Sequence, residues 1–132
     1  MITMVALAER AEIFNTIPNH DYLGLFEADT PKKVVNFLDL TTNEVSKAMG
    51  VSKQSVRYDE KMPKELRQRL EEIAIVCELV AGYFNGDVQK TALWFRVNNP
   101  ALGGISPRDM IRFGRYHKLE KFIQNALAGN VA

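Results

Sequence analysis

The most regular feature of the chain is an apolar stripe in residues 63–84, where apolar side chains recur at alternating steps of four and three. That spacing places them on one face of an α-helix. The stripe consists of Leu66, Leu70, Ile73, Cys77, Val80 and Phe84. A second apolar side consists of Ile75, Val76, Leu79 and Tyr83. The pattern predicts a long helix whose two apolar sides indicate either the centre of the fold or half of an oligomer interface.

Residues that typically cap helices occur at intervals along the rest of the chain. The helix starts that they predict are Thr30-Pro31, Thr42, Ser52, Met62-Pro63, Asp87 and Ser106-Pro107. The predicted stops are Gly50, Asn85-Gly86 and Gly129, with a last helix after Gly114. No segment shows the alternation of apolar and polar residues that a half-buried strand needs. The sequence therefore predicts an all-α fold.

Length and composition allow such a fold to bury a core. The 132 residues are 46% hydrophobic and 25% charged, which is typical of one ordinary globular domain or two small ones. We expect a helix-turn-helix bundle in residues 31–62, joined by the long helix to a small C-terminal helical domain within residues 63–132. Residues 1–30, which Pro18 and Gly24 interrupt, form an N-terminal extension with no clear predicted element.

Several features together indicate a soluble cytoplasmic protein. The single cysteine, Cys77, excludes an internal disulfide and suits a reducing compartment. No apolar run approaches the roughly 18 residues that a membrane span needs. The first residues also make a poor signal peptide, because charged side chains follow a very short apolar start.

The sequence offers little for catalysis. An active site requires a nucleophile paired with a base, or several metal ligands. The two histidines, His20 and His117, lie far apart in the chain, and Cys77 falls on the apolar stripe. We therefore expect no enzyme, no metal site and no cofactor.

The charge of the chain is small in total but unevenly distributed. The formal net charge is +1. Residues 47–70 hold seven basic and three acidic side chains, and residues 108–132 hold five basic and two acidic ones. The two basic segments favour an acidic partner such as nucleic acid. A solvated surface face is the alternative interpretation.

Residues 41–56, TTNEVSKAMGVSKQSV, have the pattern of a helix-turn-helix. Gly50 stands in the turn, and the small Ser46 four positions earlier lets the two helices approach closely. The apolar residues that would lock the pair against a third helix are Val45, Met49, Val51 and Val56. A recognition helix beginning at Ser52 would present side chains suited to base edges and phosphates. These predicted DNA-binding residues are Ser52, Lys53, Gln54, Ser55 and Arg57.

Two acidic residues weaken this assignment. Asp59 stands where an apolar residue often anchors the end of a recognition helix, and Glu60 adds charge that a phosphate would repel. Tyr58 can take over the packing role. The alternative is a helical pair that only builds the core.

Residues 98–111, NNPALGGISPRDMI, concentrate residues with special backbone conformations. A phosphate cradle would need a lysine and a preceding strand, which this stretch lacks. A rigid connector fits better, because Pro100 ends the helix that carries Trp94. Gly103 and Gly104 allow backbone angles that are closed to other residues.

The helix after the connector begins at Ser106-Pro107. A serine cap followed by proline is a strong start signal, and Asp109 is expected to return the capping contact to Ser106. The connector, residues 98–106, is therefore a rigid elbow that can present a surface to a partner.

In this part the chain resembles the C-terminal toxin-binding domain of the Xre/MbcA/ParS antitoxins. The shared pattern is a tryptophan-bearing helix, an asparagine-proline and leucine-glycine-glycine elbow, a serine/threonine-proline start, a glycine and a final amphipathic helix. The matching residues are Trp94, Asn99, Pro100, Leu102, Gly103, Gly104, Pro107 and Gly114. The resemblance extends back over the helix-turn-helix and covers about residues 31–132.

The resemblance implies a type II antitoxin. Members of the family bind and inhibit RES-domain toxins, which destroy cellular NAD, and commonly bind operator DNA through the helix-turn-helix. In some members the residues after the last helix reach into the active-site cleft of the toxin. The corresponding tail here is Gly129, Asn130, Val131 and Ala132, preceded by the basic residues Arg112, Arg115, Lys118 and Lys121. The resemblance implies that the toxin is contacted by this tail together with Trp94, Asn99, Pro100, Leu102, Gly103, Gly104, Arg112, Arg115 and Lys118. A frayed terminus is the alternative for this tail.

Two other functions remain open. The first is a stand-alone helix-turn-helix transcriptional regulator whose C-terminal domain only dimerises. The second is a small-molecule-binding or enzymatic helical domain, for which the sequence offers no site. A homodimer is expected, because paired half-sites suit a two-fold protein, with the two-sided long helix as its interface.

Overall fold

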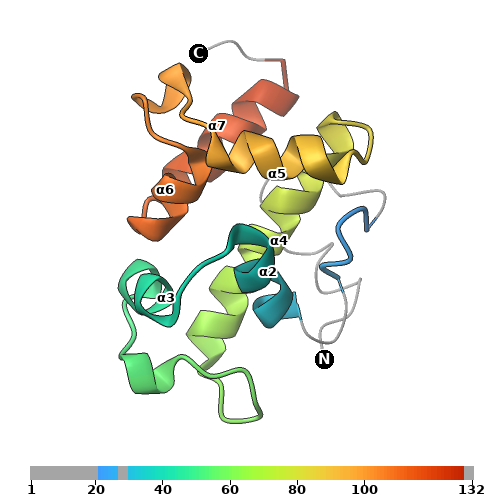
Figure 1. Cartoon of the computed structure of the whole chain (residues 1–132). Coiled ribbons are helices and arrows are strands. Elements are labelled where there is room, and N and C mark those ends of the chain that lie inside the picture. The colour runs from blue at the N-terminus through green and yellow to red at the C-terminus, as the bar shows by residue number, and fades with distance from the viewer. Residues whose placement is uncertain (1–20, 27–29, 130–132) are drawn as a thin grey trace.

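The structure, a computed structural model, describes residues 21–26 and 30–129. Its α-helices are α2 (Thr30–Leu38), α3 (Thr42–Met49), α4 (Lys64–Tyr83), α5 (Val88–Arg96), α6 (Pro107–Arg112) and α7 (Tyr116–Leu127). Two short 3-10 helices are η2 (Lys53–Ser55) and η3 (Pro100–Leu102). Within the described ranges the only β feature is an isolated bridge between Asn99 and Ile105. The predicted all-α fold is confirmed (Figure 1).

Helix α4 lies at the centre of the fold. Helices α2, α5 and α7 all pack against it (Figure 1). Leu70 and Leu79, which lie on its two apolar sides, are 0% and 7% exposed. The chain itself covers these two positions, so this part of α4 forms the centre of the fold, which is the first of the two predicted alternatives. A homodimer stays a prediction.

The turns around α2 and α3 follow the predicted signals with a shift of one residue. Helix α2 ends at Leu38, because Asp39 takes a left-handed conformation with φ of 52°. The N-cap of α3 is Thr41 and not the predicted Thr42, since the Thr41 hydroxyl accepts from the backbone N–H of Glu44. Gly50, with φ of 69°, ends α3 as predicted.

The recognition helix predicted to begin at Ser52 is not an α-helix. Residues Lys53–Ser55 form a single turn of 3-10 helix, and Val56 is already extended with ψ of 90°. The Ser52 hydroxyl bonds the Ser55 hydroxyl at 2.8 Å and makes no capping bond to the backbone. Without that cap the turn does not propagate, because the first turn of a helix is its costliest part.

The boundaries of α4 and α5 also follow local signals. Asn85 and Gly86, both with positive φ, end α4 as predicted. The side chain of Asp87 then caps α5 by accepting from the backbone N–H of Lys90 at 3.0 Å. Helix α5 ends at Arg96, so Pro100 does not end it as predicted but begins the 3-10 helix η3.

No helix in the described part of the chain is long and apolar enough to cross a membrane. The predicted N-terminal extension lies mostly outside the described residues, as do His20 and the tail residues Asn130, Val131 and Ala132.

Candidate partner-binding surfaces

The elbow is closed by its own backbone. The N–H of Asn99 donates to the carbonyl of Ile105 at 3.0 Å, and the N–H of Gly104 donates back to the carbonyl of Asn99 at 3.1 Å. The Asn99 side chain accepts from the N–H of Ala101 at 3.0 Å. These bonds within the loop give it a defined shape.

Gly103 and Gly104 are needed for backbone conformation and not for space. Their φ values are 78° and 85°, in the left-handed region that other residues rarely adopt. A Cβ atom at either position would meet nothing within 4 Å. Both glycines and Pro100 are exposed, while Leu102 packs partly against the core. The predicted elbow residues therefore form a stiff, exposed loop anchored by Leu102.

The helix after the elbow begins as predicted, with one difference. The Ser106 hydroxyl accepts from the backbone N–H of Asp109 at 3.0 Å. The Asp109 carboxylate pairs with Arg112 at 2.8 Å, where the sequence predicted a returning bond to Ser106. The charge of Arg112 is thus paired by a carboxylate of its own helix.

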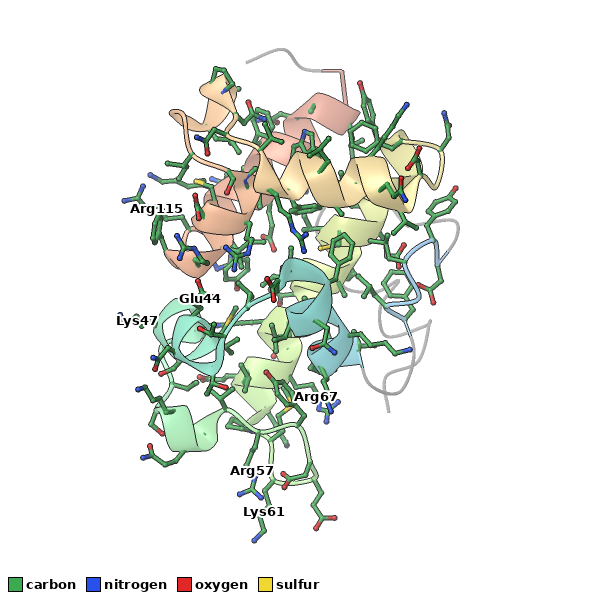
Figure 2. All side chains as sticks on the ribbon, viewed as in Figure 1. Glu44, Lys47, Arg57, Lys61, Arg67 and Arg115 are labelled. Carbon is green, nitrogen blue, oxygen red and sulfur yellow. The ribbon has the colours of Figure 1, made fainter. Side chains whose placement is uncertain are left out.

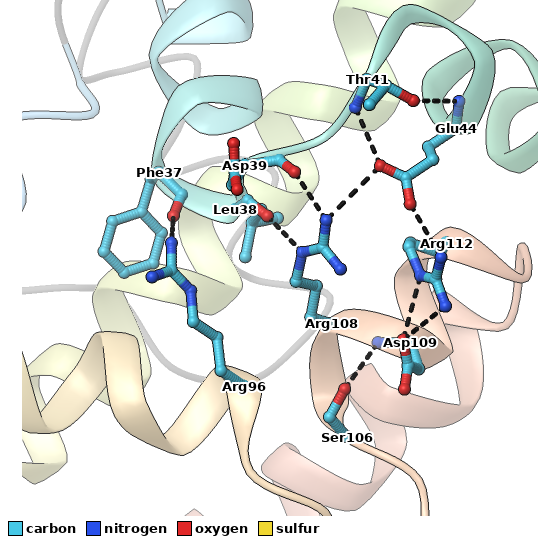
Figure 3. A network of polar contacts seen from close by, with 10 residues as sticks. All are labelled: Phe37, Leu38, Asp39, Thr41, Glu44, Arg96, Ser106, Arg108, Asp109 and Arg112. Carbon is cyan, nitrogen blue, oxygen red and sulfur yellow. Dashed lines mark hydrogen bonds and ion pairs between the residues drawn. The ribbon is translucent and has the colours of Figure 1, made fainter.

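Two arginines attach both ends of the elbow to helix α2 (Figure 3). Arg96, at the end of α5, donates to the carbonyl of Phe37 at 3.2 Å. Arg108, in the first turn of α6, donates to the carbonyls of Leu38 and Asp39 at 2.6 Å each. The carbonyl groups at the end of a helix lack intrahelical partners, so the guanidinium groups satisfy them.

Glu44 of α3 completes this network. Its carboxylate accepts from the N–H of Thr41 at 2.9 Å, and pairs with Arg112 at 2.8 Å and Arg108 at 3.4 Å (Figure 3). Burial alone would raise the pKa of Glu44, but the bonds from Thr41 and Arg112 and the charge of Arg108 hold it below its ordinary value. The predicted toxin-binding residue Arg112 therefore has a structural partner.

An apolar groove opens between α4, α5 and α7. It has a volume of about 170 Å³. Its lining consists of Val80, Tyr83, Phe84, Trp94, Phe122, Ile123, Ala126 and Leu127. Trp94, which the sequence predicts to contact a partner, lies in its wall with its ring against Phe95. Sequence reasoning missed the groove because it needs the packing of three helices.

Large apolar side chains are exposed beside this groove. Tyr83, which lines it, is 70% exposed. Leu93 and Val97 are 62% and 50% exposed and lie one helical turn apart at the end of α5 that leads to the elbow. Exposed apolar groups that gather in this way are typical of protein-binding surfaces.

The predicted basic residues of the last helix do not lie next to the tail. Arg115 is the N-cap of α7, and Lys118 lies in its first turn. Gly129 follows the other end of the helix, about 18 Å away at 1.5 Å per residue. In Figure 1 the elbow and the C-terminal end of α7 lie at the same end of the molecule, whereas the α6–α7 turn lies beside α3.

The predicted DNA-binding residues lie on the 3-10 turn and the loop after it. Lys53 and Gln54 are exposed. Arg57 bonds the carboxylate of Asp59 through two nitrogens, and the same carboxylate accepts from the N–H of Lys61. Arg57 is therefore paired with its neighbour, while Lys53 makes no ion pair with another described residue.

Two buried carboxyl groups were not anticipated from the sequence. Burial raises the pKa of Glu120 to about 8, with a further contribution from the charge of Glu72. Burial also raises the pKa of Glu78 to about 8, and its oxygens accept from the backbone N–H groups of Leu23 and Leu25. Burial thus favours the uncharged form of both carboxyl groups.

The described residues contain no group of three or more side chains that could hold a metal ion. Cys77 is fully buried, and burial raises the pKa of its thiol. His117 is 72% exposed and lies 3.4 Å from the carboxylate of Glu120. Binding surfaces rather than reactive groups are thus the candidate functional features.

Comparison with models of protein families, with curated proteins and with solved structures gives no match for this chain.

Proposed function

We propose that the chain is the antitoxin of a type II toxin–antitoxin pair, acting in the cytoplasm. In this proposal it neutralises a RES-domain toxin by direct binding and represses its own operon. It needs no catalytic group, metal or cofactor for either task. Two features support the proposal. The first is the sequence resemblance of residues 31–132. The second is the presence of two candidate surfaces, the apolar groove between α4, α5 and α7 and the exposed turn that carries Lys53 and Gln54.

The apolar surface beside the elbow carries the antitoxin part of the proposal. It combines the groove lined by Trp94 with the exposed side chains of Tyr83, Leu93 and Val97. A stiff elbow next to apolar anchors suits a protein partner, because little conformational freedom is lost on binding. The elbow residues that would contact the toxin are Asn99, Pro100, Leu102, Gly103 and Gly104.

The test is co-expression with the protein encoded beside this gene, scored by growth and by cellular NAD. The wild-type chain should rescue both. The variant Val97→Glu places a charge on the apolar surface at an exposed position, so folding should persist while toxin binding weakens by at least about tenfold. Val88→Glu is the matched control, because Val88 is 46% exposed at the other end of α5.

The outcomes separate the candidate functions. If no neighbouring protein is toxic, or the two proteins never associate, the stand-alone regulator that only dimerises becomes the better proposal. If both variants neutralise the toxin as well as the wild type does, the binding surface lies elsewhere.

The tail has its own test. A chain that lacks residues 129–132 should lose inhibition if these residues occupy the active-site cleft of the toxin. Inhibition at full strength would show that the tail is not the inhibitory element and that binding through the elbow suffices.

A further inference from the structure

Three parts of the sequence meet at one corner of the molecule: the end of α3 with the following η2, the N-terminal half of α4, and the α6–α7 turn. The α6–α7 turn lies on the end of α3, since a Cβ atom at Gly114 would be 3.3 Å from the carbonyl oxygen of Ala48. The 3-10 helix η2, which follows α3 in the sequence after Gly50, packs against α3. Arg69 of α4 donates to the carbonyl of Met49 at 2.9 Å and fixes the end of α3. The corner is therefore a rigid feature.

Unpaired basic side chains cover this corner. We define the corner surface as Lys47, Lys53, Arg115 and Lys118, all of which are exposed. Among the described residues none of the four makes an ion pair. Figure 2 shows Lys47 and Arg115 extending outward on the same side of the molecule. Lys53 is contributed by the turn beside α3, and Lys118 by the first turn of α7.

The acidic groups near the corner do not cancel this charge. Glu44, three residues before Lys47, is turned away to Arg108 and Arg112. Glu120, two residues after Lys118, is buried, and burial raises the pKa of its carboxyl group to about 8. The corner surface is therefore positive without local compensation.

We propose that the corner surface binds the phosphate backbone of duplex DNA. The proposal rests on the DNA-binding part of the proposed function and names the surface that performs it. Lysine and arginine on several rigid elements, with the exposed Gln54 amide between them, are the groups that contact phosphates. A protein partner is less suited because, of the five large apolar side chains exposed in the described part of the chain, four belong to α4, α5 and the residue after α5, namely Tyr83, Val88, Leu93 and Val97.

The structure also indicates the character of the binding. A single 3-10 turn is too short to lie along a major groove as a recognition helix does, so few base edges can be read. Most of the affinity should then come from phosphate contacts and fall steeply with salt. Lys47 and Arg115 are contacts that the helix-turn-helix pattern alone does not assign to DNA.

The experiment is a binding titration with fluorescent duplexes of roughly 30 base pairs, about three helical turns. One duplex has the sequence upstream of this gene, and the other has the same base composition in scrambled order. The variant Lys47→Gln/Arg115→Gln removes two charges from the corner. The control Lys32→Gln/Lys90→Gln removes two charges from exposed positions on α2 and α5.

We expect the corner variant to bind both duplexes roughly tenfold to a hundredfold more weakly than the wild type at about 50 mM salt. Its log–log salt slope should be smaller by about 2, one for each lost phosphate contact. The control variant should retain the wild-type slope. Circular dichroism of both variants checks that they are folded.

Three results would overturn the inference. If the corner variant matches the control, DNA binding survives as a function but does not use this surface. If the wild type binds neither duplex, both the inference and the DNA-binding part of the proposed function fail, while toxin neutralisation is unaffected. If single-stranded RNA is bound and duplex DNA is not, duplex DNA is the wrong partner for this surface. The variant Phe113→Ala, which removes the exposed ring at this corner, would then weaken the binding of RNA.

Discussion

Helix α3 and the segment after Ser52 begin with the same signal but form different structures. Each starts at a hydroxyl residue in an extended conformation, Thr41 in one and Ser52 in the other. Helix α3 then continues for eight residues, whereas the second segment stops after one 3-10 turn of three residues. The comparison shows what a helix start requires beyond its cap residue.

The difference lies at the third position of each segment. Glu44 accepts from the N–H of Thr41 and leaves the Thr41 hydroxyl free to cap the helix. The corresponding residue after Ser52 is Ser55, whose hydroxyl bonds the Ser52 hydroxyl instead. A capping box therefore forms in the first segment and cannot form in the second. Glu44 also pairs with two arginines of α6, so long-range ion pairs hold α3 in addition to its cap.

The largest effect is expected from Glu44→Ala. The substitution removes one half of the capping box and the shared partner of Arg108 and Arg112. We expect the free energy of unfolding, measured by urea denaturation, to fall by about 2 kcal/mol. Glu44→Gln is the control, since its amide oxygen can still accept from Thr41. If the two variants are equally destabilised, the charge of Glu44 and not its capping bond stabilises α3.

Acid should weaken α3 through the same residue. The pKa of Glu44 is lower in the folded chain than its ordinary value near 4.5, because the bonds from Thr41 and Arg112 and the charge of Arg108 outweigh burial. The ionised form therefore stabilises the folded state above about pH 4.5, and this contribution is lost as the pH falls through the lower folded pKa. The stability difference between the wild type and Glu44→Gln should shrink over that range. A difference that is constant from pH 7 to pH 3 would contradict this assignment.

Thr41→Ala should have a smaller effect. It removes the hydroxyl that caps the N–H of Glu44 and should lower the free energy of unfolding by about 1 kcal/mol. Thr42→Ala is a matched control, because Thr42 is exposed inside the first turn and should change stability by less than about 0.5 kcal/mol. A larger loss from Thr42→Ala than from Thr41→Ala would mean that Thr42, the cap that the sequence pattern favours, is the capping residue.

The sequence predicted those parts of the fold that short-range chemistry determines. The caps of α5 and α6, the left-handed Gly50 and the stiff elbow glycines each depend on a few neighbouring residues. Even the failure at Ser52 has a local cause, since the partner hydroxyl of Ser55 lies three residues away.

The candidate surfaces could be predicted only in part, because they depend on which distant segments meet. Arg108 and Leu38 are separated by 70 positions, and no spacing rule links them. The groove around Trp94 requires α4, α5 and α7 to be in place. Likewise, Arg115 was assigned to the tail from its position in sequence, whereas packing of Gly114 on Ala48 places it beside Lys47. The distribution of charge along the sequence reveals the two basic segments, but it does not show that the fold brings them together at the corner surface.

The most specific test is to give the segment after Ser52 the capping box that α3 has. Ser55→Glu creates a Ser-x-x-Glu box after Ser52 and frees the Ser52 hydroxyl to cap the turn. We expect amide exchange at Val56 and Arg57 to slow and the Cα chemical shifts of residues 53–57 to move toward helical values. The gain in stability should be about 0.5 kcal/mol, because one helical turn without long-range anchors adds little. Ser55→Ala is the control, since it also frees the Ser52 hydroxyl but supplies no carboxylate. Unchanged shifts in both variants would show that the Arg57–Asp59 pair and the extended Val56, rather than the missing box, keep this segment from becoming a helix.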